Sequence, residues 1–318
     1  MLPSIGRMKV AQLSSFGPPT QIQIVEVFRP EVLEPADVLV RVFSSGFNPI
    51  EWKVRNGAMG QALHRALPAT LGWECAGVVE KLGDDVKDFS VGEQVFALTP
   101  FSRDGTHAEF VVVDQAHLAR KPASLSFEQA AAAPMTSQAA WSMIEASGSL
   151  KGRRVLILGA GGSVGHWLVQ LAKGQGAQIC ATASGLDMQA VLALGADDVL
   201  DHHTMSIEQF EPVDIVFDLV GGELQARSWK LIKPDGKLTS IASPPDASIA
   251  RRPDVNGQFI FTQPRGSVLA EIGKRIDAGH LIPLPVSLVR PLADIVEIHA
   301  MAEAGNLHGK TVFRIADA

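Results

Sequence analysis

The chain has 318 residues, 46% of them hydrophobic and 19% charged, which excludes a disordered or fibrous protein and allows two domains with sizeable cores. Its formal net charge is −6 and it has no Lys/Arg cluster, so nucleic acids and anionic membrane surfaces are poor partners. It has no tyrosine and only two cysteines, Cys75 and Cys180, which excludes a Tyr proton donor and a four-cysteine zinc site and favours a reducing compartment.

The first 120 residues are rich in short strand-like runs. Apolar, β-branched segments at 38–42, 75–79, 94–98 and 108–113 are separated by turns that contain Gly, Pro and Asp. Many short strands close together predict a barrel-like antiparallel unit.

From residue 121 the pattern changes. The alanine-rich segment 127–133, with Ser126 as its N-cap, predicts a helix. Strands at 155–158, 178–183, 198–200, 215–219 and 237–241 follow, with helices over 163–175 and 188–194. Such alternation predicts a parallel, doubly wound sheet. Beyond residue 264, two helical stretches precede a final strand over 311–315.

A glycine-rich turn lies between the first strand of this sheet and its helix. Glycine permits a tight turn and a close approach of the backbone to a pyrophosphate, and the helix N-terminus offers free N–H groups. In this strand–turn–helix context the pattern favours dinucleotide binding over the alternative, a turn whose glycines serve only the packing of helix on strand. The candidate phosphate-binding residues are Gly159, Gly161, Gly162, Ser163, Val164 and Gly165.

The second strand of the sheet ends at Ala183-Ser184-Gly185, without the acidic residue that usually holds the ribose 2′-hydroxyl of NAD. A small hydroxyl side chain leaves room for a 2′-phosphate and can donate to it, so we predict NADPH as the cofactor, with Ser184 beside its 2′-phosphate. Neither Lys nor Arg follows Ser184 closely, and Asp187 has the wrong charge for a phosphate. The alternative is that Ser184 is an ordinary turn residue.

Six segments, in this order, resemble the zinc-independent quinone oxidoreductases of the medium-chain dehydrogenase/reductase superfamily. They are Asn48–Gly57, similar to NPIDWKxRxG; Gly72–Val79, similar to GxDxAGxV; the glycine turn, similar to GAxGGVG with Ser163 in place of a glycine; and Leu194–Asp197, Asp218–Gly222 and Gly309–Lys310. The resemblance implies an α/β fold with a GroES-like β-barrel catalytic domain, residues 1–120 and 264–318, and a Rossmann doubly wound NADP-binding domain, residues 121–263.

The resemblance also bears on metal binding. Zinc alcohol dehydrogenases of the superfamily have a Cys at the position of Asn48 and a His at that of Trp73, and Glu74 alone cannot form a catalytic zinc site, which needs three protein ligands. The adjacent His202 and His203 are interpreted as solvated loop residues, because neighbours on a strand end point to opposite sides and no third ligand is evident. We therefore expect no metal.

Without a Lewis acid, alcohol oxidation is not expected, whereas hydride transfer to an electron-poor acceptor needs binding, orientation and a donor at the developing oxyanion. Asn48 is the first catalytic candidate and also a cofactor-binding candidate, because the resemblance places it near the nicotinamide ribose and the substrate, and an amide donates without changing protonation. Its alternative role is a turn residue before Pro49. Trp52 is the second candidate, as an apolar wall for a flat acceptor or, alternatively, a core aromatic.

Further cofactor contacts come from two considerations. Ligands bind at the carboxyl ends of parallel strands, which indicates residues 220 and 241–242. The resemblance adds residues 259–261, a region that flanks the cofactor and often pairs subunits. The family also has a Thr at the position of Ala139, and the hydroxyl of Thr136 is expected to replace the one that is missing there. The candidates are Thr136, Val220, Ile241, Ala242, Phe259 and Phe261, each with sheet core or ordinary packing as the alternative.

The sequence thus predicts a zinc-independent oxidoreductase that transfers hydride from NADPH to a quinone or an α,β-unsaturated carbonyl compound. The resemblance implies a homodimer. A cytoplasmic location is expected, because neither a signal peptide nor a membrane-length apolar run is found. Two other classes stay open: an NADPH-binding protein with little turnover, and a zinc-type alcohol dehydrogenase.

Overall fold

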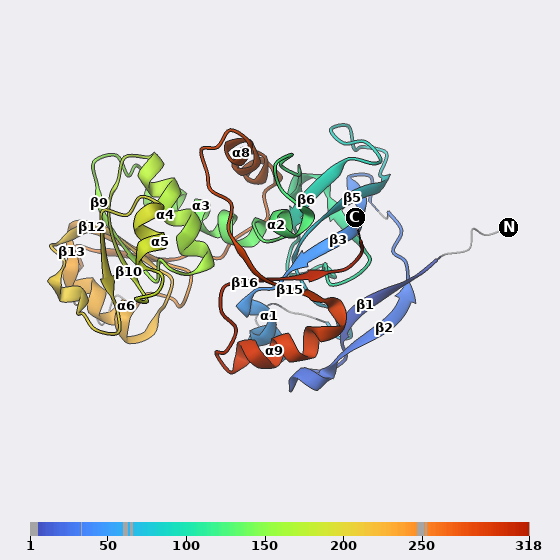
Figure 1. Ribbon diagram of the computed structural model, residues 1–318, viewed down its shortest axis with the longest axis horizontal. Helices are drawn as coiled ribbons and strands as arrows, with labels where there is room; N and C mark the ends of the chain where they lie inside the picture. Colours follow the sequence, from blue (N-terminus) through green and yellow to red (C-terminus); the bar gives the residue numbers. More distant parts are fainter. Residues whose placement is uncertain are drawn as a thin grey trace. The chain divides into compact units, whose positions relative to one another are not determined.

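The computed structural model describes residues 6–32, 34–59, 63, 66–246, 251 and 253–317 (Figure 1). The chain divides into two compact units: unit 1 comprises Met1–Met135 and Gln263–Ala318, and unit 2 comprises Thr136–Thr262. The first boundary falls later than the predicted one at residue 120, because helix α2 (Phe127–Ala131) packs on strands β3 (Asp37–Gly46) and β5 (Glu74–Leu82) of unit 1.

Unit 1 is rich in short strands. Its other strands are β1 (Arg7–Leu13), β2 (Ile22–Phe28), β4 (Ala69–Thr70), β6 (Gln94–Leu98), β7 (Phe110–Asp114), β8 (Leu118–Arg120), β15 (Val286–Pro291) and β16 (Lys310–Arg314). Its other helices are α1 (Pro49–Arg55), α8 (Gly266–Asp277) and α9 (Ile295–Glu303), with short 3₁₀ turns at Pro19–Gln21, Gln115–His117 and Leu292–Asp294.

The largest sheet of unit 1 is organised around β3. Its strand order is β15-β16-β3-β5-β6-β8, with β7 also paired to β3, and every pair except β15–β16 is antiparallel. A separate sheet has the order β2-β1-β4. Strand β3 is buried along almost its whole length. Short, mostly antiparallel strands around one buried strand confirm the predicted β-rich domain.

Unit 2 is an alternating α/β unit. Its strands are β9 (Arg154–Leu158), β10 (Gln178–Ala183), β11 (Asp198–Asp201), β12 (Val213–Asp218), β13 (Ile232–Ser240) and β14 (Asn256–Phe259). Its helices are α3 (Pro134–Ser147, which begins at the unit boundary), α4 (Ser163–Gly174), α5 (Met188–Ala193) and α6 (Gly222–Ser228), with 3₁₀ turns at Ile207–Gln209 and Trp229–Leu231.

All strands of unit 2 pair in parallel, in the order β11-β10-β9-β12-β13-β14. This is the strand order of a doubly wound dinucleotide-binding sheet, which confirms the predicted Rossmann architecture. Strand β12 is buried on both faces, as a central parallel strand should be. Among the described residues, no helix combines the length and apolar character needed to cross a membrane.

A histidine is buried in unit 1 without a hydrogen-bond partner. His299, on α9, is fully buried, and neither ring nitrogen has a partner among the described residues. Its ring lies edge-on to Phe47, with ring centroids 5.1 Å apart. Burial lowers the pKa of His299 well below its ordinary value of 6.5, and the nearby charges of His107 and Arg55 lower it further. The folded protein therefore holds this imidazole neutral.

We expect the free energy of unfolding to fall as the pH drops through about 6.5, because the unfolded chain then binds a proton that folded His299 excludes. This loss amounts to at most about 1.4 kcal/mol per pH unit. His299→Phe, which keeps the edge contact with Phe47, should remove this part of the pH dependence in urea unfolding between about pH 8 and about pH 5. Substitution of His280, an exposed histidine, is the control; an unchanged pH dependence in His299→Phe would contradict the prediction.

Candidate active site

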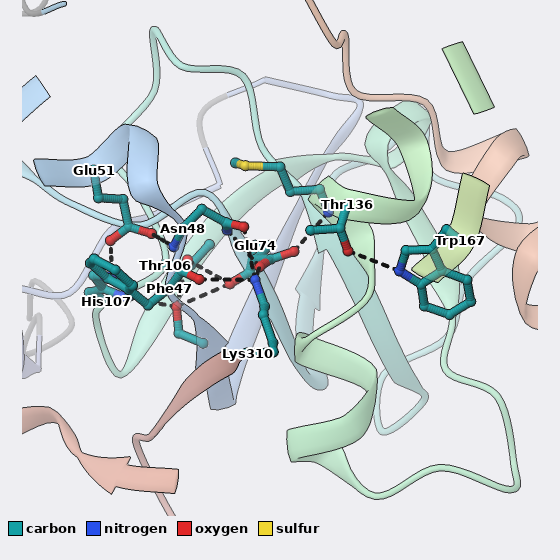
Figure 2. Close-up of polar contacts among 11 residues, drawn as sticks. Phe47, Asn48, Glu51, Glu74, Thr106, His107, Thr136, Trp167 and Lys310 are labelled. Carbon is teal, nitrogen blue, oxygen red and sulfur yellow. Dashed lines mark hydrogen bonds and ion pairs between the residues drawn. The ribbon is translucent and has the colours of Figure 1, made fainter. Parts of the chain in front are cut away.

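A buried network of charged and polar side chains lies at the end of β3 in unit 1 (Figure 2). Asn48 and Glu51 lie at the start of α1, just after β3, whereas Glu74 begins β5 and Lys310 begins β16. The pairing of β3 with both of these strands brings the four side chains together, and each is at most 4% exposed.

The Lys310 ammonium lies at the centre of the network. It forms an ion pair with Glu74 Oε1 and donates to Asn48 Oδ1 at 2.9 Å and to the Phe47 carbonyl at 3.0 Å. These bonds use all three hydrogens of an ammonium. Lys310 therefore has no hydrogen left for a substrate, and its role here is to hold and polarise its neighbours.

Glu74 uses both of its carboxylate oxygens. Oε1 accepts from Lys310 and, at 2.7 Å, from Asn48 Nδ2, while Oε2 accepts from the backbone N–H of Met135 at 2.7 Å. A Cβ at Gly46 would collide with Glu74 Oε1, so glycine at this position lets β3 approach the carboxylate. The buried charge of Glu74 is thus fully compensated.

Asn48, the predicted catalytic residue, is held by three partners. Its backbone N–H donates to Glu51 Oε1 at 3.0 Å, Nδ2 donates to Glu74, and Oδ1 accepts from Lys310. An amide nitrogen carries two hydrogens, and among the described residues only one of those on Nδ2 has an acceptor. Asn48 lies just before the first residue of α1. Its side-chain amide is held in one orientation and keeps one N–H hydrogen that has no acceptor among the described residues.

The network continues from Glu51 to His107. His107 Nε2 lies 2.6 Å from Glu51 Oε2, and Nδ1 lies 2.8 Å from Ser45 Oγ, which donates to the Glu74 carbonyl at 3.0 Å. These side chains are fully buried. Gly72 has φ +86°, and a Cβ there would come within 2.6 Å of His107 Nδ1, so the turn before β5 requires glycine.

Apolar side chains surround the network. Trp52, the second predicted catalytic residue, is half-buried on α1 and packs in one cluster with Trp73, Phe101 and Met135. Trp73 is fully buried, and its ring centroid lies 4.9 Å from that of Phe101. Position 73 is thus part of the apolar core.

The residues at this place do not fit the zinc centre of the zinc-type alcohol dehydrogenases. The indole of Trp73 offers only an N–H, which cannot ligate a metal. Both oxygens of Glu74 are already engaged, and the Lys310 ammonium lies against them. A metal cation would have to displace this ammonium and would meet the oxygens of Glu74, Asn48 and the Phe47 carbonyl, a set without the His or Cys ligands on which catalytic zinc sites are built.

The predicted dinucleotide-binding turn lies in unit 2 between β9 and α4. Gly159 has φ +80°, and its N–H donates to Thr182 Oγ1 at 3.0 Å. A Cβ at Gly165 would collide with the backbone of Ala160, so helix and turn pack too closely for any other residue. Gly161 lies in the turn and Gly162 precedes α4, whose first turn contains Ser163, Val164 and Gly165. The first N–H groups of a helix have no partner within it, so the turn fits a pyrophosphate.

Ser184 directly follows β10 and is half-buried. Its hydroxyl donates to the Asp187 carboxylate. Asp187 is exposed and lies against the glycine turn, since a Cβ at Gly161 would meet Asp187 Oδ2 at 2.9 Å. The structure therefore places a carboxylate and a hydroxyl side by side at the end of β10.

The carboxyl ends of β12, β13 and β14 carry the other predicted residues. A Cβ at Gly159 would lie 2.7 Å from Val220 Cγ2, so Val220 borders the glycine turn. Asp218 holds the turn beyond β12 through the N–H groups of residues 220 and 221, and its carbonyl accepts from the N–H of residue 241 at 3.2 Å. The residues at these ends are Val220, Ile241, Ala242, Phe259 and Phe261, all partly or well exposed.

Thr136 lies near the start of α3. Its Oγ1 accepts from the indole N–H of Trp167 on α4 at 3.0 Å (Figure 2). Thr136 is 5% exposed, so its hydroxyl joins α3 to α4.

The interpretation of His202 and His203 as side chains on opposite sides of a strand is wrong. Strand β11 ends at Asp201, and both histidines lie in the turn that follows, with ring centroids 4.0 Å apart. Residues of a tight turn do not alternate as those of a strand do, so the two rings share one side.

Sequence reasoning assigned no role to Lys310, Glu51 or His107. Lys310 and Asn48 are 262 residues apart in the sequence, and the pairing of β16 with β3 brings them together in the fold. A usable signal was present: Glu74 and Lys310 each stand directly before an apolar strand run and carry opposite charges. A charged side chain that such a strand carries into the core requires a partner of opposite charge.

Two parts of the chain match known families. Residues 34–123 match the alcohol dehydrogenase GroES-like domain, and residues 194–313 match the zinc-binding dehydrogenase family.

Similar proteins cover nearly the whole chain. It is 32% identical over 333 residues to the NAD(P)H oxidoreductase RTN4IP1, mitochondrial, of Danio rerio, covering 91% of this chain and 86% of that relative. It is 31% identical over 297 residues to the NADPH-dependent alkenal/one oxidoreductase, chloroplastic, of Arabidopsis thaliana, covering 89% and 73%. The structure of the quinone oxidoreductase from Coxiella burnetii matches with a TM-score of 0.90 at 30% identity, covering 98% and 100%. The chain belongs to the quinone oxidoreductase family of the medium-chain dehydrogenase/reductase superfamily.

Proposed function

We propose that this protein is an NADPH-dependent reductase of quinones or α,β-unsaturated carbonyl compounds. The observation that carries the proposal is the Asn48 amide, which Glu74 and Lys310 hold in place with one Nδ2 hydrogen unused among the described residues. The similar proteins include a quinone oxidoreductase and an alkenal/one oxidoreductase, which supports both acceptor classes.

NADPH supplies the hydride when it is bound. The residues of the glycine turn and the first turn of α4 would hold its pyrophosphate. The unused amide hydrogen of Asn48 donates to the acceptor's carbonyl oxygen, where negative charge develops as the hydride arrives. The Lys310 ammonium, 2.9 Å from Asn48 Oδ1, polarises this amide. The chain has no tyrosine and the hydrogens of Lys310 are all used, so the proton that completes the reduction comes from solvent or from the ribose hydroxyl of the cofactor.

We propose that the reaction needs no zinc at this site. The Lys310 ammonium already provides a positive charge beside Asn48 and Glu74, and Trp73 offers no ligand atom. Zinc-type alcohol dehydrogenase activity is the rejected alternative; alcohol oxidation that is lost after chelator treatment and recovered on added zinc, in the wild type and in His203→Gln alike, would revive it.

We propose NADPH rather than NADH because the residue at the end of β10 is Ser184 and not an acid. The negative charge of Asp187 disfavours a bound 2′-phosphate, and the Ser184 hydroxyl donates its hydrogen to the Asp187 carboxylate. Without that hydrogen bond, the hydroxyl can rotate and donate to a 2′-phosphate.

Two substitutions at this place should shift cofactor preference in opposite directions. Ser184→Asp places a second carboxylate beside the 2′-phosphate, and since like charges in contact cost several kcal/mol, the NADPH/NADH ratio of kcat/KM should fall roughly 100-fold. Asp187→Asn removes a negative charge and should raise the ratio. Steady-state kinetics with both cofactors measure both changes; parallel shifts in the two variants would contradict this account of the site.

We propose a homodimer formed through β14, the last strand in the sheet order of unit 2. Phe259 ends this strand and is 37% exposed, and Phe261, two residues further on, is 38% exposed. Light scattering with Phe259→Ser and Phe261→Ser variants tests this.

We also propose a cytoplasmic location. Both cysteines are buried and free, as a reducing compartment allows. Burial raises the pKa of Cys75 to about 12, so its thiol is unreactive.

Loss of NADPH absorbance, with ortho- and para-quinones and short enones offered in turn, tests the function directly. Turnover with either class supports the reductase, and the faster class identifies the acceptor chemistry. Tight NADPH binding without consumption by any acceptor would instead support a binding protein with little turnover.

A further inference from the structure

Three consecutive residues at the end of β11 gather possible metal ligands on one tight turn of unit 2. One ligand atom each from Asp201, His202 and His203 lies within 4.8 Å of the other two. The turn is closed by the N–H groups of Thr204 and Met205, which donate to the Asp201 carbonyl at 3.2 and 2.9 Å. The three side chains are therefore held close together by local backbone geometry.

Two hydrogen bonds orient these ligands. His202 Nδ1 lies 2.7 Å from the Ala183 carbonyl oxygen, so Nδ1 carries the hydrogen and Nε2 presents a lone pair. Asp201 Oδ1 accepts from the His203 N–H at 3.0 Å. Histidine ligands in metal sites usually donate their other nitrogen to a carbonyl or carboxylate, which fixes the ring and raises its basicity. Among the described residues, no Lys or Arg pairs with Asp201.

We propose that Asp201, His202 and His203 form a binding site for a divalent transition-metal ion such as Zn²⁺. Two imidazoles and one carboxylate suit zinc, copper and nickel better than calcium or magnesium, which prefer oxygen ligands. Asp201 and both histidines are at least partly exposed, so water can complete the coordination. A bound ion would fix the turn after β11 to the end of β10 through the His202–Ala183 bond, and so stabilise unit 2.

The test is a Zn²⁺ titration of tag-free, chelator-treated protein by calorimetry. We expect one ion per chain, and a loss of affinity of roughly tenfold or more in Asp201→Asn and in His203→Gln. Zn²⁺ should also raise the melting temperature of the wild type, by mass action, and leave that of the two variants nearly unchanged. His280→Gln, which changes an exposed histidine of unit 1, is the control and should bind Zn²⁺ like the wild type.

Unchanged Zn²⁺ affinity in both variants would overturn the proposal, as would a wild-type protein without saturable binding. The substituted side chains are on the surface, so the melting temperatures of the metal-free variants should lie within about 2 °C of that of the metal-free wild type. The readout does not depend on hydride transfer, and a failed reductase assay would leave it unaffected.

Discussion

Lys310→Met is expected to lower the free energy of unfolding by about 3–5 kcal/mol. Lys310 is 2% exposed and Glu74 is fully buried, so the substitution leaves a carboxylate in the core without its counter-charge. It also removes donors from Asn48 Oδ1 and the Phe47 carbonyl. Urea unfolding of the wild type and the variant at neutral pH measures the loss.

The double variant Glu74→Gln/Lys310→Met separates loss of charge compensation from loss of packing. It removes both charges, so it should be more stable than Lys310→Met alone, although less stable than the wild type. Lys81→Met, on β5, is the control, because Lys81 is exposed and has no ion pair among the described residues, so its change should stay within about 0.5 kcal/mol. A Lys310→Met protein as stable as the wild type would contradict the structural role of the pair.

Much of the fold follows from local patterns. The predicted strand at 178–183 has the observed bounds of β10, and the predicted helix at 163–175 matches α4 to within one residue. Helix α3 was missed because Pro134 stands where the predicted helix ends, whereas proline is favoured in the first turn of a new helix. Strand β3 was predicted too short, because residues 43–46 include Ser-Ser-Gly, and pairing with β5 and β16 overrides their weak strand preference.

The candidate site, too, has parts that the sequence predicts and parts that it does not. The glycine turn could be predicted because a dinucleotide loop is local: its spacing and its strand–turn–helix context lie within a few residues. The partners of Asn48 could not, because β5 and β16 meet β3 through long-range pairing that a local pattern does not contain. The arrangement of His202 and His203 was predicted wrongly for a local reason: the alternation of a strand was applied to two residues that lie beyond the end of β11, in the turn.

Asn48→Ala is expected to lower kcat by roughly 10²–10³-fold, the usual effect of removing one donor from a developing oxyanion. The Asn48 amide is held by Glu74 and Lys310, so its unused hydrogen is already oriented before a substrate arrives. If the donor acts mainly in the transition state, kcat and kcat/KM should fall together, with little change in the KM for NADPH. Stopped-flow and steady-state kinetics with the better acceptor measure both constants.

The same experiment distinguishes the two roles predicted for Asn48. If its amide mainly holds the cofactor, the KM for NADPH rises while kcat is retained, and the oxyanion role is wrong. Asn56→Ala is the matched control, because Asn56 caps the end of the helix that Asn48 precedes, and among the described residues its side chain contacts only Glu303, at 3.4 Å, and the N–H of Ala58, at 3.0 Å. Its kinetics should equal those of the wild type. A parallel loss of activity in both variants would point to damage of α1, since a helix that has shifted affects both of its ends.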